Sequence, residues 1–131
     1  MSENIINVTK QNFDETVMES TIPVMLVFWA IKYPSCQRLL LTIDTLAERY
    51  RGKIQFGMID VDSQIELTSQ LGIGGLPCVL VLYNGRLYKN IGGKLPLNHY
   101  REIIEQLLAE PEIKKEIKKK KKKKTFFRKD E

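Results

Sequence analysis

A continuous apolar segment near the N-terminus limits the folds open to this chain. Residues 24–30 contain no polar or charged side chain, and Pro23 precedes them. A strand with one exposed face alternates apolar and polar side chains, whereas a strand that is apolar throughout needs cover on both faces. Even counted generously as residues 22–31, the run is too short to cross a bilayer. It predicts the central strand of an α/β sheet with helices on both faces.

The rest of the folded sequence supplies those helices and the neighbouring strands. Apolar residues recur at helical spacing, with Thr9 and Ser35 as predicted N-caps, over residues 9–18, 35–51, 63–71 and 97–108. Strands are predicted at 5–8, 54–61, 78–83 and 87–91. Asn84-Gly85, between the last two strands, is a strong hairpin signal.

Charge divides the chain at about residue 110. Residues 111–131 hold eleven Lys or Arg against four Asp or Glu, a net +7, whereas residues 1–110 hold ten against twelve, a net −2. Lys118–Lys124 is an unbroken run of seven lysines. We predict a folded domain over 1–110 and a disordered lysine-rich tail over 111–131. The tail is either a solubilising segment with no partner or a segment that binds an anionic membrane or nucleic acid.

The two cysteines and the glycines indicate no resident cofactor. Cys36 and Cys78 are too few for a disulfide scaffold, and His99, the single histidine, does not complete a zinc site with them. The glycines near position 74 lack the Lys-Ser/Thr that follows a phosphate loop. We predict no metal and no cofactor. The first residues have no positively charged n-region, and we expect a cytoplasmic protein.

Several short motifs occur in a characteristic order. Pro23 and Val24 lead into Phe-Trp-Ala at 28–30, Gly75-Leu76-Pro77 precedes the third long strand, and the hairpin is followed by Gly92. Over residues 5–109 this order resembles the thioredoxin family. The resemblance implies the thioredoxin fold, with a central mixed β-sheet flanked by helices on both faces, a cis bond before Pro77 and a part in cell redox homeostasis.

The redox motif of that family is degenerate here. Where the family has Trp-Cys-Gly-Pro-Cys, residues 32–36 read Lys-Tyr-Pro-Ser-Cys. Tyr33 replaces the first cysteine, the family's exposed nucleophile, and Cys36 matches the second, which resolves the mixed disulfide. A phenol cannot attack a disulfide, so the two-step exchange is not available through this motif.

Three further departures agree with the loss of exchange chemistry. The family's buried aspartate, which relays a proton, corresponds to Val27, and the lysine beside it corresponds to Met58. Both positions are apolar together, which avoids burying one charge without its partner. The proline that kinks the family's active-site helix corresponds to Leu41.

Three functions remain open from the sequence. The leading hypothesis is a single-cysteine thioredoxin-like protein that binds a protein partner or modulates thiols, with little dithiol reductase activity. Its predicted binding surface consists of Trp29, Tyr33, Pro34, Leu76, Pro77 and Gly92. One alternative is a thiol-disulfide oxidoreductase in which Cys36 and Cys78 are both catalytic. The other is a tethering module whose tail supplies the function. Cys36 as a small buried hydrophobe and Trp29 as a core residue are the simpler alternatives at those positions.

Overall fold

The computed structural model describes residues 4–93 and 95–116. The chain divides into two compact units, Met1–Leu95 and Pro96–Glu131. The sheet, two α-helices and a short π-helix belong to the first unit, and α3 belongs to the second.

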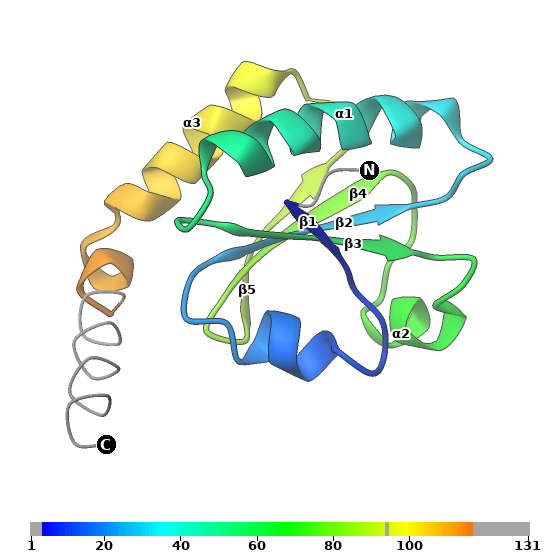
Figure 1. The fold of residues 1–131 in the computed structure, drawn as a ribbon, viewed down its shortest axis with the longest axis horizontal. Helices are drawn as coiled ribbons and strands as arrows, with labels where there is room; N and C mark the ends of the chain where they lie inside the picture. Colours follow the sequence, from blue (N-terminus) through cyan, green and yellow to red (C-terminus); the bar gives the residue numbers. More distant parts are fainter. Residues whose placement is uncertain (1–3, 94, 117–131) are drawn as a thin grey trace. The chain divides into compact units, whose positions relative to one another are not determined.

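The first unit contains a mixed five-stranded sheet with the order β1-β3-β2-β4-β5 (Figure 1). Its strands are β1 (Ile5–Asn7), β2 (Val24–Trp29), β3 (Gln55–Asp60), β4 (Cys78–Tyr83) and β5 (Arg86–Gly92). The first three run parallel, and β4 and β5 are antiparallel to their neighbours. The apolar run at 24–30 forms β2, the middle strand, as predicted.

Helices cover both faces of this sheet. Helix α1 (Pro34–Arg49) lies on one face, and η1 (Asp14–Met18) and α2 (Ile65–Gln70) lie on the other (Figure 1). Strand β2 explains why both faces need cover, because Met25 and Val27 are as fully buried as Leu26 and Phe28. Successive side chains of a strand point to opposite faces, so β2 contributes to two apolar layers.

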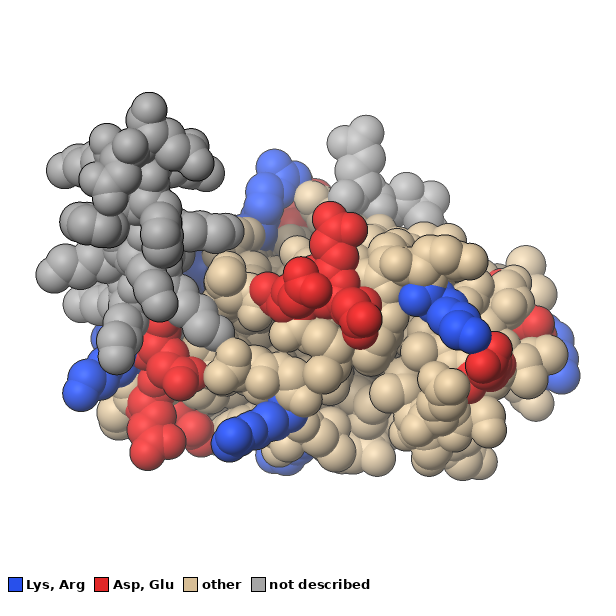
Figure 2. All heavy atoms as spheres, turned by 90° about the horizontal axis from the view of Figure 1, so that it is seen from below, with Lys and Arg blue, Asp and Glu red and all other residues tan. Residues whose placement is uncertain are grey.

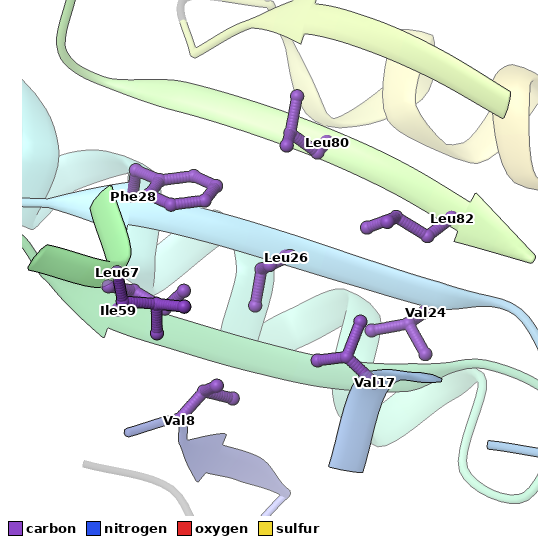
Figure 3. Close-up of a cluster of buried hydrophobic side chains, with 9 residues drawn as sticks. All are labelled: Val8, Val17, Val24, Leu26, Phe28, Ile59, Leu67, Leu80 and Leu82. Atoms are coloured by element: carbon purple, nitrogen blue, oxygen red, sulfur yellow. The ribbon is translucent and has the colours of Figure 1, made fainter. Parts of the chain in front are cut away.

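The layer on the η1 and α2 side is a cluster of buried aliphatic and aromatic side chains (Figure 3). Every second residue of β2 takes part, together with residues from the neighbouring strands and both short helices. The members are Val8, Val17, Val24, Leu26, Phe28, Ile59, Leu67, Leu80 and Leu82. Cys78, which is partly buried, packs against this cluster from the start of β4.

Figure 2 looks at the molecule from below, toward the side of η1 and α2. Among the described residues on this face, Asp and Glu gather in groups and the Lys and Arg side chains are scattered. An ion pair joins Lys10 Nζ to Glu66 Oε2 at 2.9 Å. This face therefore offers no continuous basic patch among the described residues.

Neither predicted N-cap residue takes that position, since the N-cap of η1 is Phe13, with no side-chain cap bond. Thr9 and Asn12 form a reciprocal pair before η1: the Thr9 N–H donates to Asn12 Oδ1 at 2.8 Å, and the Asn12 N–H donates to Thr9 Oγ1 at 3.4 Å. Ser35 is not a cap. The N-cap of α1 is Tyr33, with no side-chain hydrogen bond, because Pro34 takes the first helical position, where its fixed φ and missing N–H suit a helix start.

The predicted hairpin has the expected turn. Asn84 and Gly85 both adopt positive φ, 57° and 76°, which a two-residue type I′ connection requires. The turn joins β4 to β5 in antiparallel register.

The second unit begins with α3 (Leu97–Ala109), whose buried residues Tyr100, Ile104 and Leu107 recur at helical spacing. Residues 111–116 are also helical, and Ile113 is buried. Helical structure thus continues past position 110, where the tail was expected to begin. The lysine run Lys118–Lys124 lies outside the described residues. No helix within the described ranges is long and apolar enough to span a membrane.

Candidate functional site

Three segments that are distant in sequence meet at one end of the sheet. Phe28, near the end of β2, pairs with Cys78 at the start of β4, and Cys78 pairs with Gly92 at the end of β5. The turn that follows β2, the loop that precedes β4 and the residue that follows β5 therefore converge. These are the segments on which the sequence placed the binding surface.

The turn after β2 is held mainly by its own backbone. The Tyr33 N–H donates to the Ala30 carbonyl at 3.2 Å, and the Cys36 N–H donates to the Tyr33 carbonyl at 3.0 Å. The Gln37 side-chain amide donates to the Ile31 carbonyl at 2.9 Å. None of these bonds involves the large side chains of Ile31 and Tyr33, which are exposed to solvent. Ile31 is 68% exposed and Tyr33 is 43% exposed.

Cys36 has no exposed surface. It is in the first turn of α1, the helix that covers the face of the sheet opposite η1 and α2. Val27 and Met58 are register partners in the parallel pair β2 and β3, and both are buried. The positions that would hold an aspartate and a lysine in the family are thus an adjacent apolar pair. Neither Val27 nor Met58 carries a side chain that could relay a proton to or from a thiol.

Cys78 lies on the other side of the sheet. It shares a face with Leu80, two residues along β4, and packs against the cluster under η1 and α2. Its Sγ lies 3.5 Å from Asn90 Oδ1, and burial raises the pKa of its thiol above the ordinary value. Both cysteines are free. Cys36 belongs to α1, which covers the other face of the sheet, so the two thiols come from elements on opposite sides.

The loop before β4 is open to an approaching backbone. The Leu76–Pro77 peptide bond is cis. Pro77 is buried and Leu76 is half-buried against the core cluster, whereas Gly74 and Gly75 are exposed. A Cβ placed on either glycine would have no heavy atom within 4 Å. The glycines, more than the Leu76 side chain, form the accessible part of this loop.

Gly93 makes a close approach that the sequence reasoning missed. A Cβ at this position would lie 2.5 Å from Pro77 Cγ and 2.9 Å from Leu39 Cδ2. Gly92, which the sequence analysis placed on the binding surface, would have its Cβ in open space. The Gly-Gly doublet marked the region, but only the path of β5 decides which glycine faces the proline.

The other predicted surface residues differ in exposure. Pro34 is exposed at the start of α1. Trp29 is half-buried, and its indole Nε1 is buried with no hydrogen-bond partner among the described residues. Trp29 thus lies at the boundary between core and surface. Among residues 4–93 and 95–116, no three His, Cys, Asp or Glu side chains gather into a group that could hold a metal ion.

Comparison with known proteins agrees with this architecture. The thioredoxin family model matches residues 4–106. Thioredoxin of Haemophilus influenzae is 29% identical over 106 residues, which cover 81% of this chain and 98% of that protein. The chloroplastic M-type thioredoxin of Spinacia oleracea is 32% identical over 107 residues, 82% of this chain and 59% of that protein. Thioredoxin 1 of Nostoc sp. is 28% identical over 101 residues, 77% and 94% of the two chains. The chain belongs to the thioredoxin family.

Proposed function

We propose that this protein binds extended segments of a protein partner at the proline-loop end of its sheet and carries out little or no dithiol exchange. The observation that carries the proposal is the replacement of the nucleophile position by an exposed apolar side chain, Tyr33, beside an open glycine loop. Tyr33, in place of the family's cysteine, removes the attacking thiol and adds a side chain that a partner can contact at the same position.

The state of Cys36 supports the absence of exchange. A thiol must reach its target as a thiolate to attack a disulfide. Cys36 has no exposed surface, and no disulfide joins it to Cys78. For the same reason, the proposal does not include modulation of other proteins' thiols through Cys36.

The loop geometry supports binding by strand addition. An extended segment can pair with exposed backbone groups, and pockets for alternate side chains then give specificity. Gly74 and Gly75 leave the backbone before Pro77 uncovered. Ile31 and Tyr33, both exposed, would contact the side chains of such a segment. Aromatic residues are enriched where binding energy concentrates in protein interfaces.

The oxidoreductase alternative lacks support, since Cys36 is in α1 on one side of the sheet, Cys78 packs against the cluster on the other side, and no disulfide joins them. The tethering alternative has one specific observation in its favour, the seven consecutive lysines at Lys118–Lys124. We therefore keep tail binding to anionic membranes or nucleic acid as a second function. It is separable from the first, because it depends on other residues. The cytoplasm is the compartment we propose for both.

Peptide titration of the ¹⁵N-labelled full chain tests the first function. The probes are capped eight-residue Thr/Val peptides, which favour extended backbones. We expect amide shifts at Gly74, Gly75 and Tyr33, and binding weakened by Tyr33→Ala by about three- to thirtyfold, the range of a truncated interface aromatic.

Leu87→Ala is the matched control. Leu87 is 58% exposed, but it is near the hairpin end of β5, the opposite end of the sheet from Gly92. This variant should bind as wild type does. Peptides that shift no amide in the glycine loop, or that bind the Tyr33→Ala variant equally well, would contradict the proposal.

A further inference from the structure

A pocket of about 380 Å³ opens beside the start of α1. Its wall is one side of that helix, where residues three or four apart are neighbours. The remaining wall comes from the segment that follows β5. The lining residues are Ser35, Arg38, Leu39, Thr42, Gly93 and Leu95. Its volume is at the lower end of the range for small-ligand sites.

The polar groups of the pocket are suited to an anion. Arg38 is exposed, and within residues 4–93 and 95–116 its guanidinium has no ion pair or hydrogen bond. Ser35, one helical turn before Arg38, adds a hydroxyl donor, whereas the Thr42 hydroxyl donates to the Arg38 carbonyl at 3.5 Å. A guanidinium presents paired N–H groups that match the two oxygens of a carboxylate. No acidic side chain is among the lining residues, so the cation is not neutralised within the pocket.

The pocket is continuous with the surface proposed for extended segments. Gly93 lines it and also lies against Pro77, so the pocket adjoins the proline loop. Leu39 and Leu95 give the pocket an apolar base, suited to the methylene groups of an acidic side chain. A segment that crosses the proline loop would therefore pass near this pocket.

We propose that the bound segment carries a Glu or Asp side chain whose carboxylate binds Arg38 in this pocket. The inference rests on the proposed function and adds the chemistry of the partner to it. The carboxylate would receive bidentate N–H bonds from Arg38 and a hydroxyl bond from Ser35. Charge complementarity, rather than the apolar contacts at Tyr33, would then set which segments are preferred.

A Glu scan of the same peptides tests this. One Glu is moved along the capped Thr/Val octapeptide, and each Glu peptide has a Gln-matched twin. At one position we expect the Glu peptide to bind about three- to tenfold more tightly than its twin, between the values for an exposed and a desolvated charged pair. The difference should shrink as salt rises.

Arg38→Gln should remove the Glu preference, so that each Glu peptide binds no more tightly than its Gln twin. The matched control is Arg49→Gln, which makes the same charge change at the other end of α1 and should keep the preference. Inorganic phosphate is a further probe and should bind the pocket no more tightly than the Glu peptide does.

The outcomes separate the two proposals. Peptides that bind the glycine loop without any Glu preference, or a preference that survives Arg38→Gln, would overturn the carboxylate inference alone. Peptides that do not bind the loop at all would overturn the proposed function and the inference with it. Tighter Arg38-dependent binding of phosphate than of any peptide would show a site for free anions and overturn the peptide as the source of the charge.

Discussion

Tyr33 is at the position from which thioredoxin-type exchange begins. It is the N-cap of α1 and is 43% exposed, with Lys32 Nζ 5.5 Å from the centre of its ring. The turn around it is held by backbone bonds to Ala30 and from Cys36, which do not depend on the Tyr33 side chain. The geometry of the turn should therefore survive substitution at this residue.

The substitution Tyr33→Cys should restore a local disulfide with Cys36 but not full reductase activity. The new thiol would be three residues from Cys36 across the same turn, the spacing of the family motif. Val27 and Met58 would still provide no proton relay. We expect loss of both thiols on mild oxidation, measured by mass spectrometry, and insulin reduction well below that of an ordinary thioredoxin.

Ile31→Cys is the control for this experiment, since it adds an exposed thiol to the same turn outside the motif spacing. It should remain reduced under the same oxidant. If wild type reduced insulin as an ordinary thioredoxin does, and Cys78→Ser abolished that activity, the binding function would be refuted in favour of the oxidoreductase.

The two native thiols should differ in reactivity at neutral pH. Cys78 is partly exposed, but burial raises its pKa, so less of it is thiolate than in the unfolded chain. We expect iodoacetamide to modify Cys78 more slowly than a thiol in urea-unfolded protein. Cys36 should react more slowly still, by about a hundredfold or more, because it needs local opening.

The pH dependence of this reaction has a definite sign. Since the folded pKa of Cys78 is above the unfolded value, the folded state favours the neutral thiol. The resulting stabilisation is complete below the unfolded pKa and is lost as pH rises through the folded pKa. The alkylation rate should therefore rise with pH, with its midpoint at higher pH in the folded protein. Equal midpoints in folded and unfolded protein would refute this.

At the scale of secondary-structure elements, Gly93 joins β5, the proline loop and α1. Its missing Cβ allows Pro77 and Leu39 to approach the same backbone position. The contact is between elements that are remote in the chain, and it also forms one wall of the Arg38 pocket. Packing at Gly93 thus fixes the position of the proline loop relative to α1.

The substitution Gly93→Ala should lower the free energy of unfolding by about 1–3 kcal/mol, the usual cost of overpacking. Gly92→Ala is the adjacent control, with no heavy atom within 4 Å of its new Cβ, and should change stability by less than about 0.5 kcal/mol. Urea unfolding of both variants measures the difference. The same cost for both substitutions would mean that the close approach does not constrain the loop.

The elements differ in how far the sequence could predict them. β4 begins and ends where expected, at Cys78 and Tyr83, because a buried strand between a proline and an Asn-Gly turn has clear local limits. The start of α1 was misjudged, since a favourable cap residue, Ser35, competed with the stronger constraint of Pro34 at the first helical position.

At the candidate site, the local sequence pattern predicts only part of the geometry. The family resemblance located the turn, the proline loop and the glycine doublet. It could not decide between Gly92 and Gly93, nor tell that Cys78 packs on the face opposite Cys36, because both depend on which way a backbone faces in the sheet. The Arg38 pocket had no sequence signal, since its residues are brought together by α1 and the segment after β5.

At the scale of the whole molecule, charge is the main asymmetry. Residues 1–110 carry a net −2, and the described surface in Figure 2 shows no continuous basic patch. The cationic charge is concentrated beyond position 110, in a segment that includes Lys118–Lys124. Binding to an anionic surface would therefore depend on that segment alone.

Deleting residues 117–131 removes nine Lys or Arg and two Asp or Glu. We expect the full chain to bind phosphatidylserine vesicles or duplex DNA without sequence preference, and the deletion to abolish this. Affinity for DNA should fall about 10³-fold or more between 50 and 200 mM salt, as for six to ten phosphate contacts. The deletion begins after Ile113, the last buried residue that the structure describes, so thermal stability should be nearly unchanged.

A tail of the same length with Lys118–Lys124 replaced by Gln is the control that separates charge from length. It should fail to bind, as the deletion does, while extended peptides still shift the amides of Gly74 and Gly75. Vesicle or DNA binding equal to wild type by the Gln tail would rule out the lysines as the source of affinity.

The burial of Cys36, with no second thiol beside it, has a consequence for regulation. A protein that alternates between a dithiol and a disulfide can hold its partner with two different strengths, and the redox poise of the cell selects between them. This chain has one covalent form at its motif. Its proposed complex would form and dissociate according to concentration and competing segments, with no dithiol–disulfide switch at the motif.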